Sequence, residues 1–295
     1  MNDYWSQYVQ TTDELYRSRA LRFHDGNKEL WLMSIGAQDG MNILEVGCAG
    51  GLFCHRIKTY LPHTQVTGLD FDTGHIAYAQ AKTKELNLDC RFVNGDALEM
   101  PFADDTFDLC FSHTVIEHLP TMPFLREQRR VLKPGGRISV LSARTRLSLR
   151  DNNWFITSKE EKALSDKLWQ QAEKVTPVKN IGAYELSETD FPKALEQAGF
   201  REVDVGFITV TDYAPDNAFV PDETALEQIE CHRRHSLAAA EKPLRLAPEA
   251  LTASERQEFF DMINRRYDER IRLYQSGEKL WDFSNTTVLF ATGKK

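Results

Sequence analysis

Short apolar runs alternate with helical segments between Met41 and Ser142, and no other feature of this sequence restricts the fold as strongly. The apolar runs occupy 41–46, 65–69, 90–93, 107–112 and 137–142, and helical patterns occupy 52–60, 73–87 and 122–132. Strands that alternate with helices pair in parallel through right-handed crossovers, which places helices on both faces of one sheet. Uniformly apolar runs are typical of strands buried on both faces. The pattern therefore predicts a doubly wound α/β sheet.

The rest of the chain divides into additions to this core and its completion. The predicted parts are an N-terminal helical cap (1–40), the core (41–143), an insertion (144–186), the resumed core (187–210), a helical insertion (211–284) and a last strand (285–295). The resumed core contains a helix over 188–198 and a strand over 202–210. The last strand, Thr286 to Thr292, has no crossover helix directly before it. We expect it to pair antiparallel beside the preceding strand, with 211–284 as a lid or substrate region.

Composition excludes several classes of protein. The chain has 36 Lys and Arg against 44 Asp and Glu, a net charge of −8, so a nucleic-acid partner held by charge alone is not expected. Its five cysteines are odd in number and suggest no disulfide framework. The opening residues are polar, and no run approaches the roughly 20 apolar residues that span a bilayer. We expect a cytoplasmic protein without a membrane partner.

A glycine-rich turn, Glu45-Val46-Gly47-Cys48-Ala49-Gly50-Gly51, joins the first predicted strand to the first helix. Glycine allows the backbone to turn sharply there and to approach a ligand closely. In a doubly wound sheet this turn faces the crevice at the carboxyl ends of the strands. The spacing is not G-x-G-x-x-G, which disfavours an NAD-dependent oxidoreductase. Without other evidence, the segment could be a tight turn that binds nothing.

Acidic residues stand at the ends of the first three predicted strands. Glu45 precedes the glycines, Asp70 ends the second strand, and Asp96 follows the third. A carboxylate at the second position can accept hydrogen bonds from ribose hydroxyls, and one at the third can accept from the exocyclic amine of adenine. Acids would repel a pyrophosphate but attract a cationic sulfonium. Together they form a predicted acceptor set for adenosine, although each alone could be a solvated loop charge.

The stretch from Ile43 to Val140 resembles the class I S-adenosylmethionine-dependent methyltransferases, especially the ubiquinone and menaquinone branch. The matching residues are ILEVGCAGG, GLD at 68–70, GDALEMPFADDTFDLCFSHTVIEHL at 95–119 and VLKPGG at 131–136. The resemblance implies a Rossmann-like, seven-stranded, mostly parallel sheet with an antiparallel last strand. It also implies S-adenosylmethionine as cofactor, S-adenosylhomocysteine as its product, and methyl transfer to a small-molecule acceptor.

The resemblance implies roles by position. Gly47 and Gly51 would face the methionine part, Asp70 the ribose, Phe71 the adenine face, and Asp96 with Ala97 the adenine edge. The whole expected cofactor set is Glu45, Gly47, Cys48, Ala49, Gly51, Asp70, Phe71, Asp96, Ala97 and His113. Ala49 departs from the pattern, because the family usually has glycine there.

Methyl transfer of this family is an in-line displacement whose leaving group is neutral. Alignment of the two reactants supplies on the order of 7–11 kcal/mol. A base is needed only when the nucleophile arrives protonated. His113, after the fourth strand, is the candidate base, and the alternative is a histidine that only shapes the pocket. His118 matches a position where the family commonly has His, which we interpret as packing and capping.

The residues that select the acceptor are harder to identify. Aromatic side chains of the variable segments are candidates, since aromatic faces can hold a cation, although such residues more often form a cap's own core. The candidate acceptor residues are Tyr4, Trp5, Tyr8, Trp154 and Tyr213. Cys231 and His235 share a helix face, but a structural zinc needs about four ligands, so no metal is expected.

Alternatives to a small-molecule enzyme remain at this point. One is a methyltransferase that acts on a macromolecule, disfavoured for nucleic acid by the acidic charge and by Ser112-His113-Thr114-Val115 in place of an Asn/Asp-Pro-Pro-Tyr-type tetrapeptide. Another is a non-catalytic protein that only binds S-adenosylmethionine. A homodimer is also left open.

Overall fold

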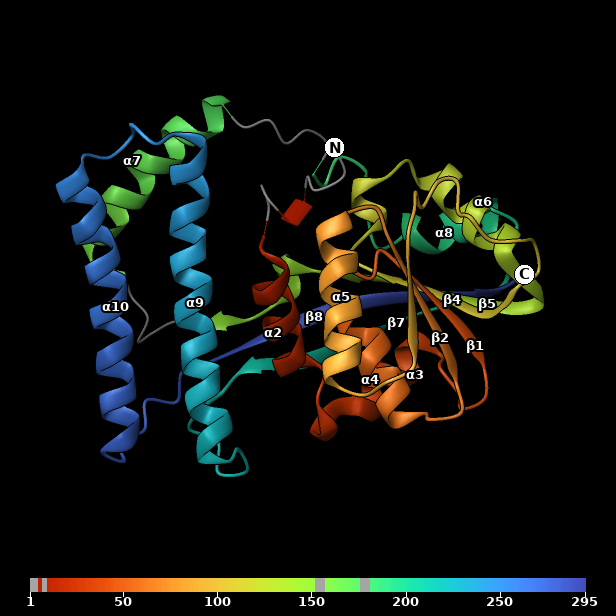
Figure 1. Ribbon diagram of the computed structural model, residues 1–295, viewed down its shortest axis with the longest axis horizontal. Coiled ribbons are helices and arrows are strands. Elements are labelled where there is room, and N and C mark those ends of the chain that lie inside the picture. Colours follow the sequence, from red (N-terminus) through yellow and green to blue (C-terminus); the bar gives the residue numbers. More distant parts are fainter. Residues whose placement is uncertain (1–4, 7–9, 152–156, 176–180) are drawn as a thin grey trace.

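The fold was taken from a computed structural model, which describes residues 5–6, 10–151, 157–175 and 181–295. Its centre is one twisted sheet with the spatial order β3-β2-β1-β4-β5-β8, and β7 pairs with the outer edge of β8. The parallel strands of the core are β1 (Asn42–Val46), β2 (Gln65–Asp70), β3 (Cys90–Asn94), β4 (Phe107–His113) and β5 (Leu132–Ala143). Their carboxyl ends therefore meet at one edge of the sheet (Figure 1).

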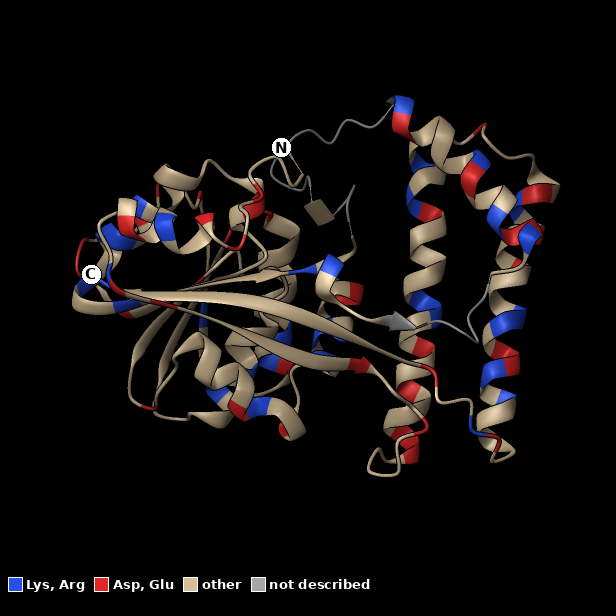
Figure 2. Cartoon of the chain, turned by 180° about the vertical axis from the view of Figure 1, so that it is seen from behind, with Lys and Arg blue, Asp and Glu red and all other residues tan. Residues whose placement is uncertain are grey.

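The last strand, β8 (Phe283–Lys294), lies antiparallel between β5 and β7 (Arg201–Tyr213). The predicted fold class, a doubly wound and mostly parallel sheet with an antiparallel last strand, is confirmed. A short strand that we did not predict, β6 (Arg150–Asp151), also pairs with β8. Seen from behind in Figure 2, β7 and β8 extend as a long two-stranded ribbon from the core toward the helices of the cap.

Helices cover both faces of the sheet, as the uniformly apolar strands predicted. On one face lie α3 (Lys28–Ile35), α4 (Leu52–Tyr60) and α5 (Thr73–Glu85), and on the other lie α6 (Thr121–Val131) and α8 (Asp190–Gln197). Adjacent residues of β1 show the division: Ile43 packs with Phe53 of α4, whereas Leu44 packs in the cluster of Phe124 and Phe191. Alternate side chains of a strand point to opposite faces, so β1 is buried on both.

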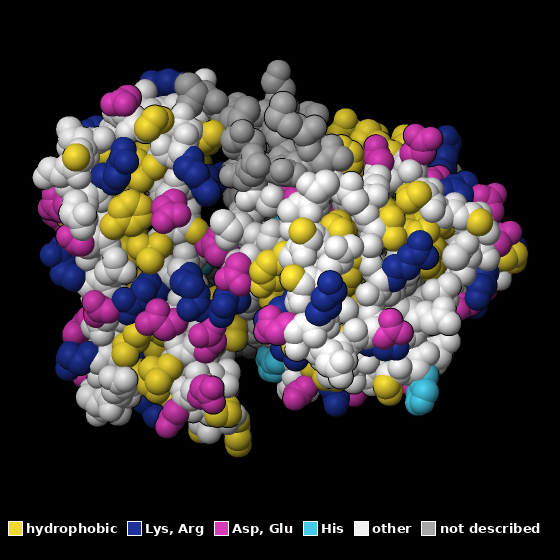
Figure 3. All heavy atoms as spheres, viewed as in Figure 1, with side chains coloured by type: hydrophobic (Ala, Val, Ile, Leu, Met, Phe, Trp, Pro, Cys, Tyr) yellow, Lys and Arg dark blue, Asp and Glu magenta, His cyan; other side chains and the backbone are white. Residues whose placement is uncertain are grey.

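A helical cap stands beside the sheet. It consists of α7 (Lys159–Val175), α9 (Asp222–Leu246) and α10 (Ala253–Gln275), which share a small apolar core of their own. The helix α2 (Thr12–Arg22) lies between α9 of the cap and α5 of the core (Figure 1). Basic and acidic side chains are interspersed over the face of the cap that Figure 3 shows. Within the described residues, no helix is both long enough and apolar enough to cross a membrane.

Two segments differ from the sequence-based expectation. The helical pattern over 3–36 is divided, because the chain bends after α2 at Phe23, which is fully buried, and makes the short 3-10 helix η1 (Asp25–Asn27) before α3. The turn expected at 133–136 belongs to β5 instead. Its backbone finds strand partners, since Lys295 N donates to Gly136 O at 2.9 Å and Gly135 N donates to Lys295 O at 3.3 Å.

Candidate active site

The turn after β1 is built so that two of its positions admit only glycine. Gly47 and Gly51 have φ of +75° and +82°, which L-residues with side chains avoid. A Cβ at Gly47 would lie 2.5 Å from Cγ2 of Val115, and one at Gly51 would lie 2.6 Å from Cζ of Phe92. The turn therefore packs closely against the ends of β4 and β3, and it opens α4 at Gly51.

Ala49, the departure from the glycine pattern, also has a left-handed backbone, with φ of +47°. This conformation is unfavourable for alanine by roughly 1–2 kcal/mol. The residue is held there by its own amide, which donates to Oδ2 of Asp70 at 2.8 Å. The loop after β1 is thus tied to the last residue of β2.

The Asp70 carboxylate is fixed by three donors. Oδ2 accepts from Ala49 N, and Oδ1 accepts from Asp72 N at 2.9 Å and lies 3.4 Å from Nδ1 of His75. A carboxylate offers about four acceptor positions, so one on Oδ2 remains for a ligand. The side chain is 13% exposed and lies at the wall of a cavity. It is a rigid, preorganised acceptor.

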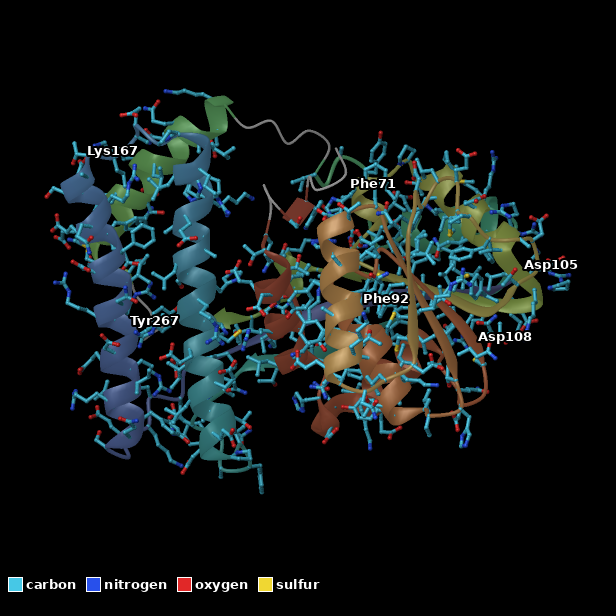
Figure 4. The ribbon with its side chains drawn as sticks, in the orientation of Figure 1. Phe71, Phe92, Asp105, Asp108, Lys167 and Tyr267 are labelled. Atoms are coloured by element: carbon cyan, nitrogen blue, oxygen red, sulfur yellow. The ribbon has the colours of Figure 1, made fainter. Side chains whose placement is uncertain are left out.

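This cavity has a volume of about 690 Å³ and opens at the carboxyl ends of β1, β2, β3 and β4. That size suits a cofactor or a small metabolite. Figure 4 shows Phe71 on this side of the core, whereas Asp105 and Asp108 lie at the opposite end of the sheet. The sequence-predicted residues that line the cavity are Trp5, Gly47, Ala49, Asp70, Phe71, Asp96, Ala97 and His113.

Asp96 and Phe71 form the part of the cavity that lies farthest from β4. Phe71 is 53% exposed, so one face of its ring is available to a ligand. One oxygen of Asp96, Oδ1, accepts from Leu98 N at 2.8 Å, which orients the carboxylate and leaves acceptor positions free. An aromatic face beside a carboxylate suits a flat heterocycle that carries an amine.

Three residues of the expected cofactor set do not line the cavity. Glu45 is 2% exposed, and its Oε2 accepts from Cys54 N and Cys54 Sγ, so it supports the start of α4 rather than facing a ligand. Burial raises the pKa of Glu45 to about 8. Cys48 is buried beneath the loop, and Gly51 contributes only its backbone turn.

His113 lines the cavity but is itself 6% exposed. Its ring packs against Trp31 and Phe53, and its Nδ1 lies 3.2 Å from Oγ1 of Thr114. Burial, and then the charges of Arg19 and Arg22, lower its pKa well below the ordinary value. The imidazole is therefore uncharged at neutral pH, able to accept a hydrogen bond but a weak base.

Two buried nitrogens of the cavity wall have no hydrogen-bond partner within the described part of the chain. They are Nε2 of His113 and Nε2 of His75, whose residues are 6% and 2% exposed. Buried polar atoms are rarely left unpaired, because the loss of hydration is costly. A bound polar molecule would supply the missing partners.

The opposite wall contains residues that the sequence did not indicate as ligand contacts. His118 accepts from Gly182 N at Nδ1 (3.0 Å), so its neutral ring carries the proton on Nε2, and Trp5 lies over it at 4.8 Å between ring centroids. Leu15, Arg19 and Thr114 line the same wall. Only the spacing of Leu15 and Arg19, one helical turn apart, could have suggested a shared face.

The remaining acceptor candidates are not at this wall. Tyr213 is 2% exposed and donates to Oδ2 of Asp282 at 3.0 Å, in a buried network with Arg270 at the base of the cap. It is therefore part of the cap's own core, the alternative weighed for these aromatics. Tyr4, Tyr8 and Trp154 lie outside the described residues.

The sheet order, the antiparallel β8 and a cavity beside the glycine turn agree with the fold that the resemblance to class I methyltransferases implies. A comparison with protein families agrees, since a profile for a methyltransferase domain matches residues 44–140.

Curated relatives match over the same core. Demethylmenaquinone methyltransferase of Listeria welshimeri is 35% identical over 107 residues, which cover 35% of this chain and 45% of that protein. Sterol 24-C-methyltransferase of Gibberella zeae is 36% identical over 106 residues, 35% of this chain and 28% of that protein. The chain thus spans less than half the length of these relatives.

Among solved structures, phosphoethanolamine N-methyltransferase 2 of Haemonchus contortus in complex with S-adenosyl-L-methionine is similar in fold. It has a TM-score of 0.54 and 16% sequence identity, over 99% of this chain and 59% of that one. At this identity the likeness concerns the fold.

Proposed function

We propose that this protein transfers a methyl group from S-adenosylmethionine to a small-molecule acceptor. The observation that carries the proposal is the shared cavity of Asp70, Phe71 and Asp96 at the carboxyl ends of β2 and β3. These residues offer an acceptor for ribose hydroxyls, a face for adenine and an acceptor for its amine. The relatives' names, which include acceptors as different as demethylmenaquinone and sterols, support the class of reaction.

The residues of the cavity suit this donor. The free acceptor position on Asp70 Oδ2 and the unpartnered nitrogens of His75 and His113 give a polar nucleoside the contacts that the protein alone leaves open. At Gly47, a side chain would clash with Val115, so the backbone there stays bare for the methionine part. When bound, S-adenosylmethionine supplies a methyl on a sulfonium and a neutral thioether leaving group.

The protein's own contribution is alignment and exclusion of water. Leu15, Val115 and Leu119 give the wall near β4 an apolar surface, and Trp5 lies over His118 beside it. His113 is the group placed to receive a hydrogen bond from the acceptor's nucleophile, and its lowered pKa keeps it unprotonated for that role. The small-molecule acceptor, a cytoplasmic location and a possible homodimer stay predictions, as does the lack of a nucleic-acid partner.

The experiment has two parts. Calorimetry measures binding of S-adenosylhomocysteine to the full chain, and a methyl-transfer assay with isotopically labelled donor then screens metabolites, an RNA pool and a protein extract. We expect heat on binding and label transferred to a small molecule. No heat at millimolar ligand would overturn the proposal. Binding without transfer to any acceptor would favour the non-catalytic alternative, and label in RNA or protein would favour the macromolecular one.

A further inference from the structure

One histidine of the cavity wall has a nitrogen that the protein leaves open. His75, in the first turn of α5, is 2% exposed and lines the cavity. Its Nδ1 lies 3.4 Å from Oδ1 of Asp70, whereas its Nε2 is buried and has no hydrogen-bond partner among the described residues. His55 is equally buried, but its Nδ1 lies 3.1 Å from the Tyr16 hydroxyl and its Nε2 lies 2.8 Å from Oγ1 of Thr83. Since buried polar atoms are rarely left unpaired, the open nitrogen of His75 indicates a ligand.

The contact with Asp70 determines what this nitrogen can do. A carboxylate only accepts hydrogen bonds, so Nδ1 of His75 carries the hydrogen and, in the neutral ring, Nε2 offers a lone pair. The residue is also held in place, because its amide donates to Oδ1 of Asp72 at 3.1 Å, part of the cap that opens α5. His75 therefore presents a fixed acceptor to the cavity.

Asp70 alone cannot receive both hydroxyls of a ribose. Its Oδ1 already accepts from Asp72 N and faces His75, and its Oδ2 accepts from Ala49 N, so one acceptor position is left. A ribose carries two adjacent hydroxyls, and each needs an acceptor when it leaves water. Nε2 of His75, on the side chain that contacts Asp70, is a second acceptor in the same wall. The two side chains thus match the two donors of a vicinal diol.

We propose that His75 is a specificity-determining residue of the donor site: its Nε2 accepts a hydrogen bond from one ribose hydroxyl, while Asp70 accepts from the other. The role rests on the proposed function, which supplies the ribose. A neutral imidazole suits this position, because it adds no positive charge beside a sulfonium. Two separate acceptors require both hydroxyls at once, so a nucleoside that lacks either one is discriminated against.

The first experiment uses the wild-type protein. Calorimetry compares S-adenosylhomocysteine with its 2′-deoxy and 3′-deoxy analogues. Each analogue leaves one acceptor of the wall unpaired, so each should bind roughly 5- to 150-fold more weakly. An analogue that binds as tightly as S-adenosylhomocysteine would overturn the proposal, because one of the two acceptors would then have no hydroxyl to receive.

Two variants assign one hydroxyl to His75. In His75→Asn, the side-chain amide can still donate to Asp70, but nothing replaces Nε2. We expect S-adenosylhomocysteine to bind roughly fivefold or more weakly, with no further loss for one of the two deoxy analogues and the full wild-type loss for the other. His75→Gln, whose amide oxygen can reach toward the position of Nε2, should recover part of the affinity. The control is His63→Asn, because Nδ1 of His63 also contacts an aspartate, Asp39 at 2.6 Å, but at an exposed position.

A purely structural role predicts a different pattern. If His75 only holds Asp70 or α5, His75→Asn weakens S-adenosylhomocysteine and both analogues by the same factor, or becomes insensitive to both, and the proposal is overturned. Loss of sensitivity to one analogue alone supports it and identifies the hydroxyl.

Should His75→Asn fail to fold, nitrogen-15 NMR of the wild-type complex decides. A hydrogen on Nδ1 of His75, with Nε2 as acceptor, supports the proposal, and a hydrogen on Nε2 overturns it. If S-adenosylhomocysteine does not bind wild type at all, the proposed function falls and this role with it. Binding with equal losses removes only the role of His75.

Discussion

The amide of Ala49 donates a hydrogen bond of 2.8 Å to Oδ2 of Asp70, and this contact joins the glycine turn after β1 to the end of β2. One carboxylate thus has two tasks, to hold the loop and to offer its remaining acceptor position to a ligand. The loop in turn keeps an alanine in a left-handed conformation. Both halves of this relationship can be tested separately.

Replacement of Asp70 by Asn should weaken S-adenosylhomocysteine binding. Loss of a charged acceptor costs about 1–3 kcal/mol, or roughly 5- to 150-fold in affinity, and Ala49 N can still donate to the amide oxygen of Asn. Calorimetry measures the change, with Asp166→Asn, on the exposed face of α7, as control. Unchanged affinity would remove Asp70 from the site.

Ala49→Gly should stabilise the protein. Relief of the left-handed strain outweighs the larger entropy that glycine loses on folding, for a net gain of about 0.5–1 kcal/mol in the free energy of unfolding. Urea unfolding measures the gain. The control is Ala163→Gly, at an exposed position inside α7, which should lose about 1 kcal/mol. Losses of equal size at both sites would show that Ala49 is not strained.

Glu45→Gln should change how stability depends on pH. The pKa of Glu45 is raised to about 8 in the fold, above its ordinary value of 4.5, so the folded state holds a proton that the unfolded chain releases. The stability that this proton confers is complete below pH 4.5 and is lost as pH rises toward 8, at up to about 1.4 kcal/mol per unit. Urea midpoints across this window should therefore fall in wild type relative to Glu45→Gln. Parallel profiles would contradict the assignment.

Arg270→Met should destabilise the cap. Arg270 is fully buried and pairs with Asp216 at 2.8 Å and with Asp282 at 2.7 Å, so its removal leaves two buried carboxylates without a cation. The expected cost is about 3–5 kcal/mol, visible as faster hydrogen exchange in α9 and α10. Arg272→Met on the same helix, where the pair with Glu269 is exposed, should cost less than about 1 kcal/mol. Similar exchange in both variants would disprove the network's role.

His113→Asn should lower the rate of methyl transfer more than it lowers donor binding. The imidazole can accept a hydrogen bond because burial keeps its pKa well below 6.5 and the ring uncharged, so the wild-type rate should stay level across neutral pH rather than fall near pH 6.5. Rate profiles from pH 5.5 to 8.5 test this. A tenfold loss of donor affinity with an unchanged turnover rate would make His113 a residue that only shapes the pocket.

The sheet was predictable because its signals are local. The bounds of α4 and the first residues of β2, β3 and β4 follow directly from apolar runs, turns and Pro62. The extent of β5 was not predictable. Gly135 and Gly136 are typical of a turn, and only the structure shows that Lys295, distant in sequence, pairs with them. A local sequence pattern cannot show which distant segment will form hydrogen bonds with a given stretch of backbone.

The residues that line the cavity were predictable where their place at the end of a strand determines it, as for Asp70 at the end of β2. The burial of Glu45 was not predictable, because it depends on the face of the strand: Glu45, one residue before the end of β1, lies on the side of β1 that meets α4, next to Cys54. Arg19 could not be separated from Arg17 and Arg22, since only the fold shows which of the three lines the cavity. The sequence around Tyr213 does not show whether its side chain lines a pocket or packs in the core of the cap.

The base of the cap has an architectural consequence. β7 and β8 are paired up to Tyr213 and Ser284, so the chain leaves the sheet for the insertion and returns to it at neighbouring positions. A tight hairpin of a few residues could join the same two positions without altering any other strand. The insertion that contains α9 and α10 is consequently tied to the sheet at a single junction, and a change of its length leaves the pairing of the core strands intact.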